Sequence, residues 1–148
     1  MISEIKQVVK CAIILWSRLK YTGLATFHGG INWFEQERYY EMIGGFYLYD
    51  TKSEDYQIKI VNKNNVVTKE QNDFIIHSEK YFLQSDPTND VLAFGNFSGI
   101  DMPIAWTRNY GQGRVFYTAL AHTVEELFSE ESLEMILNGI DWCAEKII

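Results

Sequence analysis

The sequence is poor in chain-breaking and cross-linking residues. Its 148 residues include only two prolines and two cysteines. It contains no low-complexity tract, and 47% of its residues are hydrophobic, which excludes a disordered chain. Cys11 and Cys143 form no C-x-x-C pair and lie in apolar surroundings, as is typical of reduced core thiols. We therefore expect one compact domain over residues 1–148, located in the cytoplasm.

Positive charge and long apolar runs are also scarce. The formal net charge is −7 and the pI is about 4.9, which argues against nucleic acid and anionic membranes as partners. The apolar run from Val8 to Trp16 is interrupted by Lys10. It is far shorter than the ~20 residues that a membrane-spanning helix needs, and no small-residue cleavage site follows it. The sequence thus predicts no membrane segment and no export signal.

The most informative stretch is Trp106–Thr123, WTRNYGQGRVFYTALAHT. It is typical of a strand end, a glycine-containing turn and a second strand, Arg114–Leu120. This second strand is apolar on both faces and so belongs at the centre of a sheet covered by helices. Thr123 and Glu126 have the spacing of a capping box, which predicts that a helix begins there. His122 would then follow the strand's carboxyl end, where open α/β sheets bind ligands.

The amino-terminal third predicts two helices around one short strand. Apolar residues repeat at three- and four-residue intervals over residues 3–20, which favours an amphipathic helix. A short strand, Leu24–Phe27, follows and ends at His28-Gly29-Gly30. We expect a second helix over Trp33–Ile43, stopping at a glycine pair. The next segment, Phe46–Lys52, is expected to be an irregular connection.

The remainder predicts strands and one final helix. The expected strands are Tyr56–Val61, a brief Phe74–Ile76, and a meander of Asp90–Gly95, Met102–Thr107 and Arg114–Leu120. The short turns within the meander imply antiparallel pairing. The last helix is expected at about Glu131–Ile147, with Ser129 as its cap. Together these elements indicate a mixed sheet between helices.

Six motifs, in this order, resemble the trehalose-utilisation (ThuA-like) family. They are GLATFHGG (23–30), YYEMIGGFY (39–47), EKYF (79–82), VLAF (91–94), PIAWTRNYGQGRVFYTALAHT (103–123) and NGIDW (138–142). The resemblance implies a flavodoxin-like, class I glutamine amidotransferase-like fold, which is a three-layer α/β sandwich with a mixed sheet. It also implies a role in carbohydrate utilisation, with trehalose or a related disaccharide bound in a crevice at the carboxyl ends of the strands.

The family domain is longer at its start, where a β-α-β unit precedes the helix that matches residues 3–20. We therefore expect an N-terminally truncated member of the family. Without those strands, Leu24–Phe27 would have an unpaired edge, which predicts a homo-oligomer formed through that edge. Several polar positions also depart from the family pattern. Tyr49 replaces a histidine, Asn65 begins the segment that matches H-P-x-T, and Ser78 begins the segment that matches D-E-x-Y.

Two histidines follow strand ends, and in the family fold both ends face one crevice. His28, His122 and Glu79 could form a set suited to acid–base catalysis on a sugar hydroxyl or to a divalent metal. The sequence has no short metal-ligand motif, so we predict the catalytic role and neither a metal nor a cofactor. The structural alternative is that both histidines bind loop backbone and shape the turns. The amidotransferase relatives carry a cysteine at the turn occupied here by His28-Gly29-Gly30, so Cys-dependent amidotransfer is not expected.

Further residues are candidates for holding the sugar. Trp106 could stack on a sugar ring, Arg108 could donate to hydroxyls, and Tyr110 is a third candidate in the same stretch. The other candidate ligand-binding residues are Tyr81, Gly29 and Gly30. The alternative is a core tryptophan and an arginine in a surface ion pair.

Three functions fit these observations. The first is a carbohydrate-processing enzyme. The second is a non-catalytic carbohydrate-binding module, and the third is a degenerate fragment without activity of its own.

Overall fold

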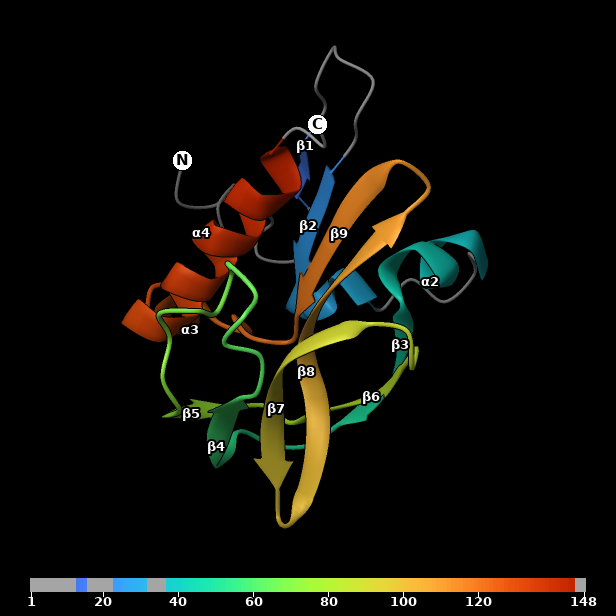
Figure 1. Ribbon diagram of the computed structural model, residues 1–148. Coiled ribbons are helices and arrows are strands. Elements are labelled where there is room, and N and C mark those ends of the chain that lie inside the picture. Colours follow the sequence, from blue (N-terminus) through green and yellow to red (C-terminus); the bar gives the residue numbers. More distant parts are fainter. Residues whose placement is uncertain (1–12, 16–22, 32–36, 146–148) are drawn as a thin grey trace.

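The computed structural model describes residues 13–15, 23–31 and 37–145 (Figure 1). Its strands are β1 (Ile13–Leu15), β2 (Gly23–Phe27), β3 (Gly45–Asp50), β4 (Glu54–Ile60), β5 (Phe74–Ser78), β6 (Tyr81–Ser85), β7 (Asp90–Phe97), β8 (Ile100–Tyr110) and β9 (Gly113–Thr118). Its helices are the 3-10 helix η1 (His28–Ile31) and the α-helices α2 (Glu37–Ile43), α3 (Val124–Leu127) and α4 (Glu130–Ala144). The described helices include none that is long and apolar enough to cross a membrane.

Seven strands form one mixed sheet in the order β1-β2-β9-β8-β7-β4-β5, and β3 pairs with β6 in a separate two-stranded sheet. β9 lies inside the large sheet, parallel to β2 and antiparallel to β8. Phe116 and Tyr117 of β9 have no exposed surface. This confirms the predicted central strand, because a strand that is apolar on both faces needs cover on both faces.

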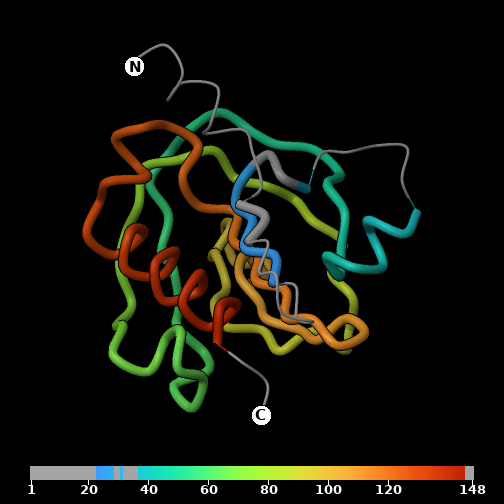
Figure 2. Tube along the Cα trace, turned by 90° about the horizontal axis from the view of Figure 1, so that it is seen from above, coloured from blue at the N-terminus to red at the C-terminus, as the bar shows by residue number. Residues whose placement is uncertain are grey.

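Helices cover both faces of the large sheet. Figure 2 shows α4 and α2 on opposite sides of the strands. α4 lies so close to β9 that a Cβ atom added at Gly139 would be 2.4 Å from the Phe116 ring. On the other side, Trp106 Nε1 of β8 donates to the Ile43 carbonyl of α2 at 2.7 Å. The α/β class and the flavodoxin-like layering are confirmed.

The predicted helix over residues 3–20 is wrong at residues 13–15, and its other residues lie outside the described part. Ile13–Leu15 forms β1, which pairs antiparallel with β2, so that Ile13 lies opposite Ala25 and Leu15 opposite Gly23. The open edge of β2 offers backbone hydrogen bonds, and β-branched residues such as isoleucine fit a strand well. The edge of β2, which was expected to be unpaired, is therefore paired with β1 of the same chain. This pairing gives no support to a homo-oligomer formed through that edge.

The irregular connection predicted at Phe46–Lys52 is also wrong. Residues Gly45–Asp50 form β3, and its partner β6 was not predicted at all. The helix expected over Trp33–Ile43 is confirmed from Glu37 onward, and residues 32–36 lie outside the described part. It ends at Ile43 and is followed by Gly44, whose φ of +80° favours glycine.

The carboxyl-terminal elements follow the predictions closely. Thr123 caps α3 by accepting from the Glu126 N–H at 3.2 Å, so the predicted helix start is confirmed, although α3 has only four residues. The Glu126 side chain accepts from the His122 N–H, so the bonds described form only half of the capping box. The final helix is α4, with Ser129 at its N-cap position but without a side-chain capping bond. The Ser129 hydroxyl instead donates to the Glu126 carbonyl at 2.8 Å, which joins the two helices.

Candidate functional site

His28 lies at the carboxyl end of β2, where the chain turns sharply into η1. Its φ is +42°, a conformation that costs free energy for a residue other than glycine and often occurs at functional sites. The ring is buried, and its Nδ1 lies 3.2 Å from the Ala119 carbonyl oxygen. A carbonyl oxygen can only accept, so Nδ1 carries the proton. In the neutral ring, Nε2 is then the nitrogen with the lone pair.

His122 lies just beyond the carboxyl end of β9. Ala121, which precedes it, also has a positive φ, +72°. His122 Nδ1 lies 2.8 Å from His28 Nε2, and the two ring centroids are 4.6 Å apart. The His122 side chain is 35% exposed whereas that of His28 is only 7% exposed, so His122 is the more accessible of the two histidines.

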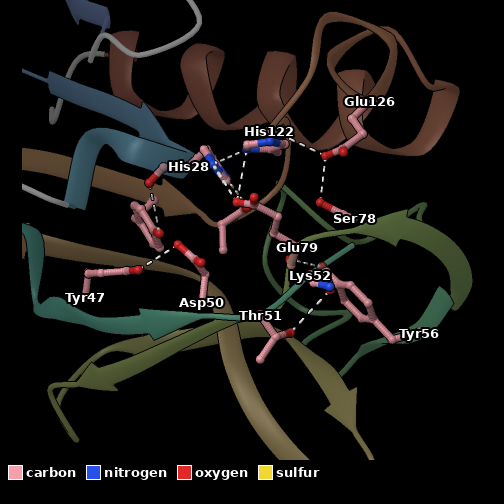
Figure 3. Close-up of polar contacts among 12 residues, drawn as sticks. His28, Tyr47, Asp50, Thr51, Lys52, Tyr56, Ser78, Glu79, His122 and Glu126 are labelled. Carbon is pink, nitrogen blue, oxygen red and sulfur yellow. Dashed lines mark hydrogen bonds and ion pairs between the residues drawn. The ribbon is translucent and has the colours of Figure 1, made fainter. Parts of the chain in front are cut away.

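Glu79 joins the two histidines from the loop between β5 and β6. Its Oε2 lies 3.2 Å from His122 Nδ1 and 3.9 Å from His28 Nε2. Partial burial raises the pKa of the Glu79 carboxyl, the nearby His122 lowers it, and the negative charges of Asp50 and Glu126 raise it again. The net result is a raised pKa, because burial is the largest of these effects. Figure 3 shows the three side chains pointing toward one another. We call His28, Glu79 and His122 the histidine–glutamate cluster.

Glu126 of α3 holds two parts of this site together. Its Oε2 accepts from the Ser78 hydroxyl at 2.7 Å and from the His122 backbone N–H at 2.9 Å (Figure 3). Ser78 directly precedes Glu79 in the chain. One carboxylate oxygen therefore links the loop that carries His122 to the end of β5, directly before Glu79.

Two tyrosines back the cluster from the small sheet. The Tyr81 ring lies 4.2 Å from the His28 ring, centroid to centroid, and the Tyr47 ring lies 5.0 Å from that of Tyr81. The Tyr47 hydroxyl donates to Asp50 Oδ2 at 2.6 Å (Figure 3). Tyr81 was predicted to bind ligand, and in the structure it is a buried residue that packs against His28.

The cluster has the geometry of a divalent-metal site as well as that of a proton relay. One ligand atom from each of its residues lies within 4.8 Å of the other two. The bond from His28 Nδ1 to a backbone carbonyl is the kind of contact that orients metal-bound histidines. Imidazole nitrogens and a carboxylate also suit several transition metals.

The other predicted ligand residues are not gathered at the cluster. Trp106 has no exposed surface, so it cannot stack on a sugar, and its prediction as a ligand residue is corrected. Arg108 Nη1 bonds Asp86 at 3.3 Å and Asn89 at 3.0 Å. The alternative of a core tryptophan and an ion-paired arginine thus describes both residues. Tyr110 lies at the far end of β8, opposite Gly113 at the amino end of β9.

Gly29 and Gly30 do lie beside the cluster, in η1 directly after His28. Tyr47 and Asp50 were not predicted as site residues, because they lie in the segment expected to be irregular. Glu126 was predicted only as part of a capping box. The spacing of Glu126 from Thr123 was the available signal, but it predicted a helix start and not a contact with Ser78.

The fold and the position of the cluster define an α/β domain of the class I glutamine amidotransferase-like type, with its polar site at the carboxyl ends of two parallel strands. A family model described as "ThuA: Trehalose utilisation" matches residues 19–143. The chain belongs to this family. The prediction that residues 1–148 form a single truncated domain stays a prediction. No curated protein sequence matches the chain significantly.

Solved structures support the fold. A putative ThuA-like protein from Bacteroides uniformis aligns with a TM-score of 0.67 at 19% identity, over 81% of this chain and 57% of that one. A putative ThuA-like protein from Parabacteroides merdae aligns with a TM-score of 0.53 at 21% identity, over 70% of this chain and 44% of that one. A β-galactosidase from Bacillus circulans sp. alkalophilus aligns with a TM-score of 0.51 at 12% identity, over 70% of this chain and 14% of that one. The chain thus spans about half the length of the ThuA-like proteins, and the likeness shows the fold alone.

Proposed function

We propose that the chain acts on a carbohydrate, trehalose or a related disaccharide, at the histidine–glutamate cluster. The observation that carries the proposal is the convergence of His28, Glu79 and His122 at the carboxyl ends of β2 and β9. Ligands of open α/β sheets bind at this edge. The family description, trehalose utilisation, supports the choice of ligand.

His122 is the proposed acid–base group because it is the more exposed histidine. Its Nδ1 lies 3.2 Å from a Glu79 carboxylate oxygen, which accepts a proton and does not donate one when ionised. With the proton on Nδ1, Nε2 of His122 has the lone pair. A sugar hydroxyl would give its proton to Nε2. His28 Nε2, at 2.8 Å, and the Glu79 carboxylate, at 3.2 Å, would share the Nδ1–H of the resulting imidazolium, and the negative charge of Glu79 would stabilise it.

His28 and Glu126 have supporting parts in this proposal. His28 is fixed by its bond to Ala119 and places its Nε2 against His122. Glu126 fixes the backbone of His122 and, through Ser78, the start of the Glu79 loop. A cytoplasmic location belongs to the same proposal, and the buried free thiol of Cys143 is consistent with it.

Turnover separates this proposal from sugar binding alone. The full chain would be incubated with trehalose, other disaccharides and keto-sugars, and the sugar would be followed by NMR. We expect conversion that His122→Ala abolishes. The matched control is His77→Ala, since His77 is an exposed histidine on β5 that is bonded to Asp55 of β4. Saturable binding without conversion would indicate a binding module. The absence of both binding and conversion would contradict both functions.

A divalent metal at the same cluster is the second candidate, favoured by the three ligand atoms within 4.8 Å of one another. A metal bound there would act as a Lewis acid on a sugar oxygen. Thermal melts with EDTA and with a panel of divalent ions would test this candidate. We expect a stabilising shift that is lost in Glu79→Gln and retained in Glu125→Gln. No shift with any ion would contradict the metal site.

A further inference from the structure

A polar cleft lies at the end of β9 opposite to the histidine–glutamate cluster. It has a volume of about 410 Å³. Its walls come from the turn after β4, the first residue of β7, the start of β9 and the end of α4. Arg114 marks the amino end of β9, whereas His122 follows the carboxyl end of the same strand. The cleft is therefore separate from the histidine–glutamate cluster.

One wall is a carboxylate held by two amides. Asp90 Oδ1 accepts from Asn62 Nδ2 at 2.7 Å, and Asp90 Oδ2 accepts from Asn65 Nδ2 at 2.9 Å. The Asn62 Oδ1 atom in turn accepts the backbone N–H groups of Asn64 and Asn65, at 3.0 and 3.2 Å. The wall is thus preorganised. Asp90 Oδ2 also accepts from the Thr107 hydroxyl at 3.5 Å, whereas Oδ1 has a further lone pair that can accept from a ligand.

The facing wall is an arginine fixed on an indole. The Arg114 guanidinium lies 5.0 Å from the centre of the Trp142 ring. Its Nη1 donates to the Trp142 carbonyl at 2.7 Å and to Glu145 Oε2 at 3.1 Å. A guanidinium has five N–H donors, and the contacts described for Arg114 use only Nη1. Donors on this wall therefore face an acceptor on the other.

We propose that this cleft binds a neutral polyhydroxylated ligand, a mono- or disaccharide. Its closely spaced amides, carboxylates and guanidinium match the alternating donors and acceptors of sugar hydroxyls. Among the described residues that line it, the ionisable groups are Asp90, Glu145 and Arg114, so acidic groups outnumber basic ones there and a phosphate or other anion is disfavoured. The volume lies at the lower end of the range for small-ligand pockets, roughly 300–1,000 Å³. The inference does not depend on catalysis at the histidine–glutamate cluster.

An NMR titration of the full chain tests this site with trehalose and glucose, and with inorganic phosphate as the anionic probe. The signals to follow are the Trp142 indole N–H and the side-chain amides of Asn62 and Asn65. We expect saturable shifts with at least one of the two sugars and none with phosphate. Asp90→Asn should raise the Kd at least tenfold. Asp101 is an exposed carboxylate at the β7–β8 turn, and Asp101→Asn should leave the Kd unchanged.

Trp142→Leu is a second variant, in case Asp90→Asn weakens the fold. It removes the indole and should also raise the Kd at least tenfold. His122→Ala should leave the cleft signals responsive, so that failure of the proposed catalytic site and failure of this site are distinguishable. Absence of sugar-dependent shifts at Trp142 and the two asparagines, or shifts with phosphate instead of sugar, would overturn the inference.

Discussion

His122 Nδ1 lies 2.8 Å from His28 Nε2, although the two residues are 94 positions apart in the sequence. They meet because β2 and β9 are parallel neighbours, with Phe27 opposite Thr118, and parallel strands have their carboxyl ends at the same edge. The backbone turns sharply after both strands, with positive φ at His28 and Ala121. These turns bring the two rings together over Glu79.

The raised pKa of Glu79 predicts how stability varies with pH. The folded state binds the Glu79 proton more tightly than the unfolded state does. The contribution of Glu79 to stability is therefore greatest below the unfolded pKa and is lost as the pH rises through the folded pKa. The free energy of unfolding of Glu79→Gln, minus that of wild type, should therefore increase as the pH rises from about 4 toward neutral. Urea unfolding at several pH values measures this.

Glu125→Gln is the control for Glu79→Gln, because it removes an equal charge from an exposed position on α3. The free-energy difference between Glu79→Gln and wild type should change with pH more than that of the control. Equal pH dependence of the two variants would contradict the burial-raised pKa of Glu79.

Glu126→Ala should destabilise the protein by about 1–3 kcal/mol, because the Ser78 hydroxyl and the His122 N–H would both lose their acceptor. Glu126→Gln keeps an oxygen that can accept both bonds and should lose less. Urea unfolding of both variants, with Glu125→Ala as control, measures the difference. Equal losses in the alanine and glutamine variants would show that the charge of Glu126 and not its position matters.

Gly139→Ala should destabilise the protein, although alanine is normally preferred to glycine inside a helix. Alanine inside a helix is favoured over glycine by about 1 kcal/mol. Here the added Cβ would lie 2.4 Å from the Phe116 ring, so α4 would have to move away from β9. We expect a net loss of about 1–3 kcal/mol, measured by thermal or urea unfolding. Glu134→Ala, at an exposed position of α4, is the control. A stabilised Gly139→Ala variant would contradict the close packing of α4 on β9.

Trp106→Phe should cost about 1–3 kcal/mol, because the Ile43 carbonyl would lose its buried hydrogen bond. Sugar binding should be unchanged under conditions where the variant is folded, since Trp106 has no exposed surface. Calorimetric titration with the disaccharide that wild type binds checks this. A variant with full stability but lost binding would restore Trp106 as a ligand residue.

The local signals in the sequence predicted the centre of the fold. The apolar faces of β9, the glycine that ends α2 and the Thr123 cap each depend on neighbouring residues, and each is confirmed. β3 was missed because its partner, β6, is distant in the chain, whereas β1 lies close in sequence to its partner β2. Apolar spacing over 3–20 favoured a helix, but a free strand edge nearby favours a strand, and a local pattern contains no information on that edge.

The site was predicted in part for the same reason. Both histidines follow strands, and the sequence alone shows this. The contacts of Glu126 with Ser78 and His122 depend on how α3 lies against the end of β5, which is a tertiary relationship. Trp106 was predicted to bind sugar because exposed tryptophans stack on sugar rings. Its residue type gave no indication that it is completely buried.

Sugar is proposed to bind at the histidine–glutamate cluster, against His122 and His28. A titration of trehalose into protein labelled with ¹⁵N at its histidine side chains tests it most directly, because His28, His77 and His122 are the only three histidines. We predict saturable shifts of the His122 and His28 ring nitrogens, with those of His77 unchanged. Unchanged His122 and His28 signals at saturating trehalose and at saturating concentrations of related disaccharides would contradict the account.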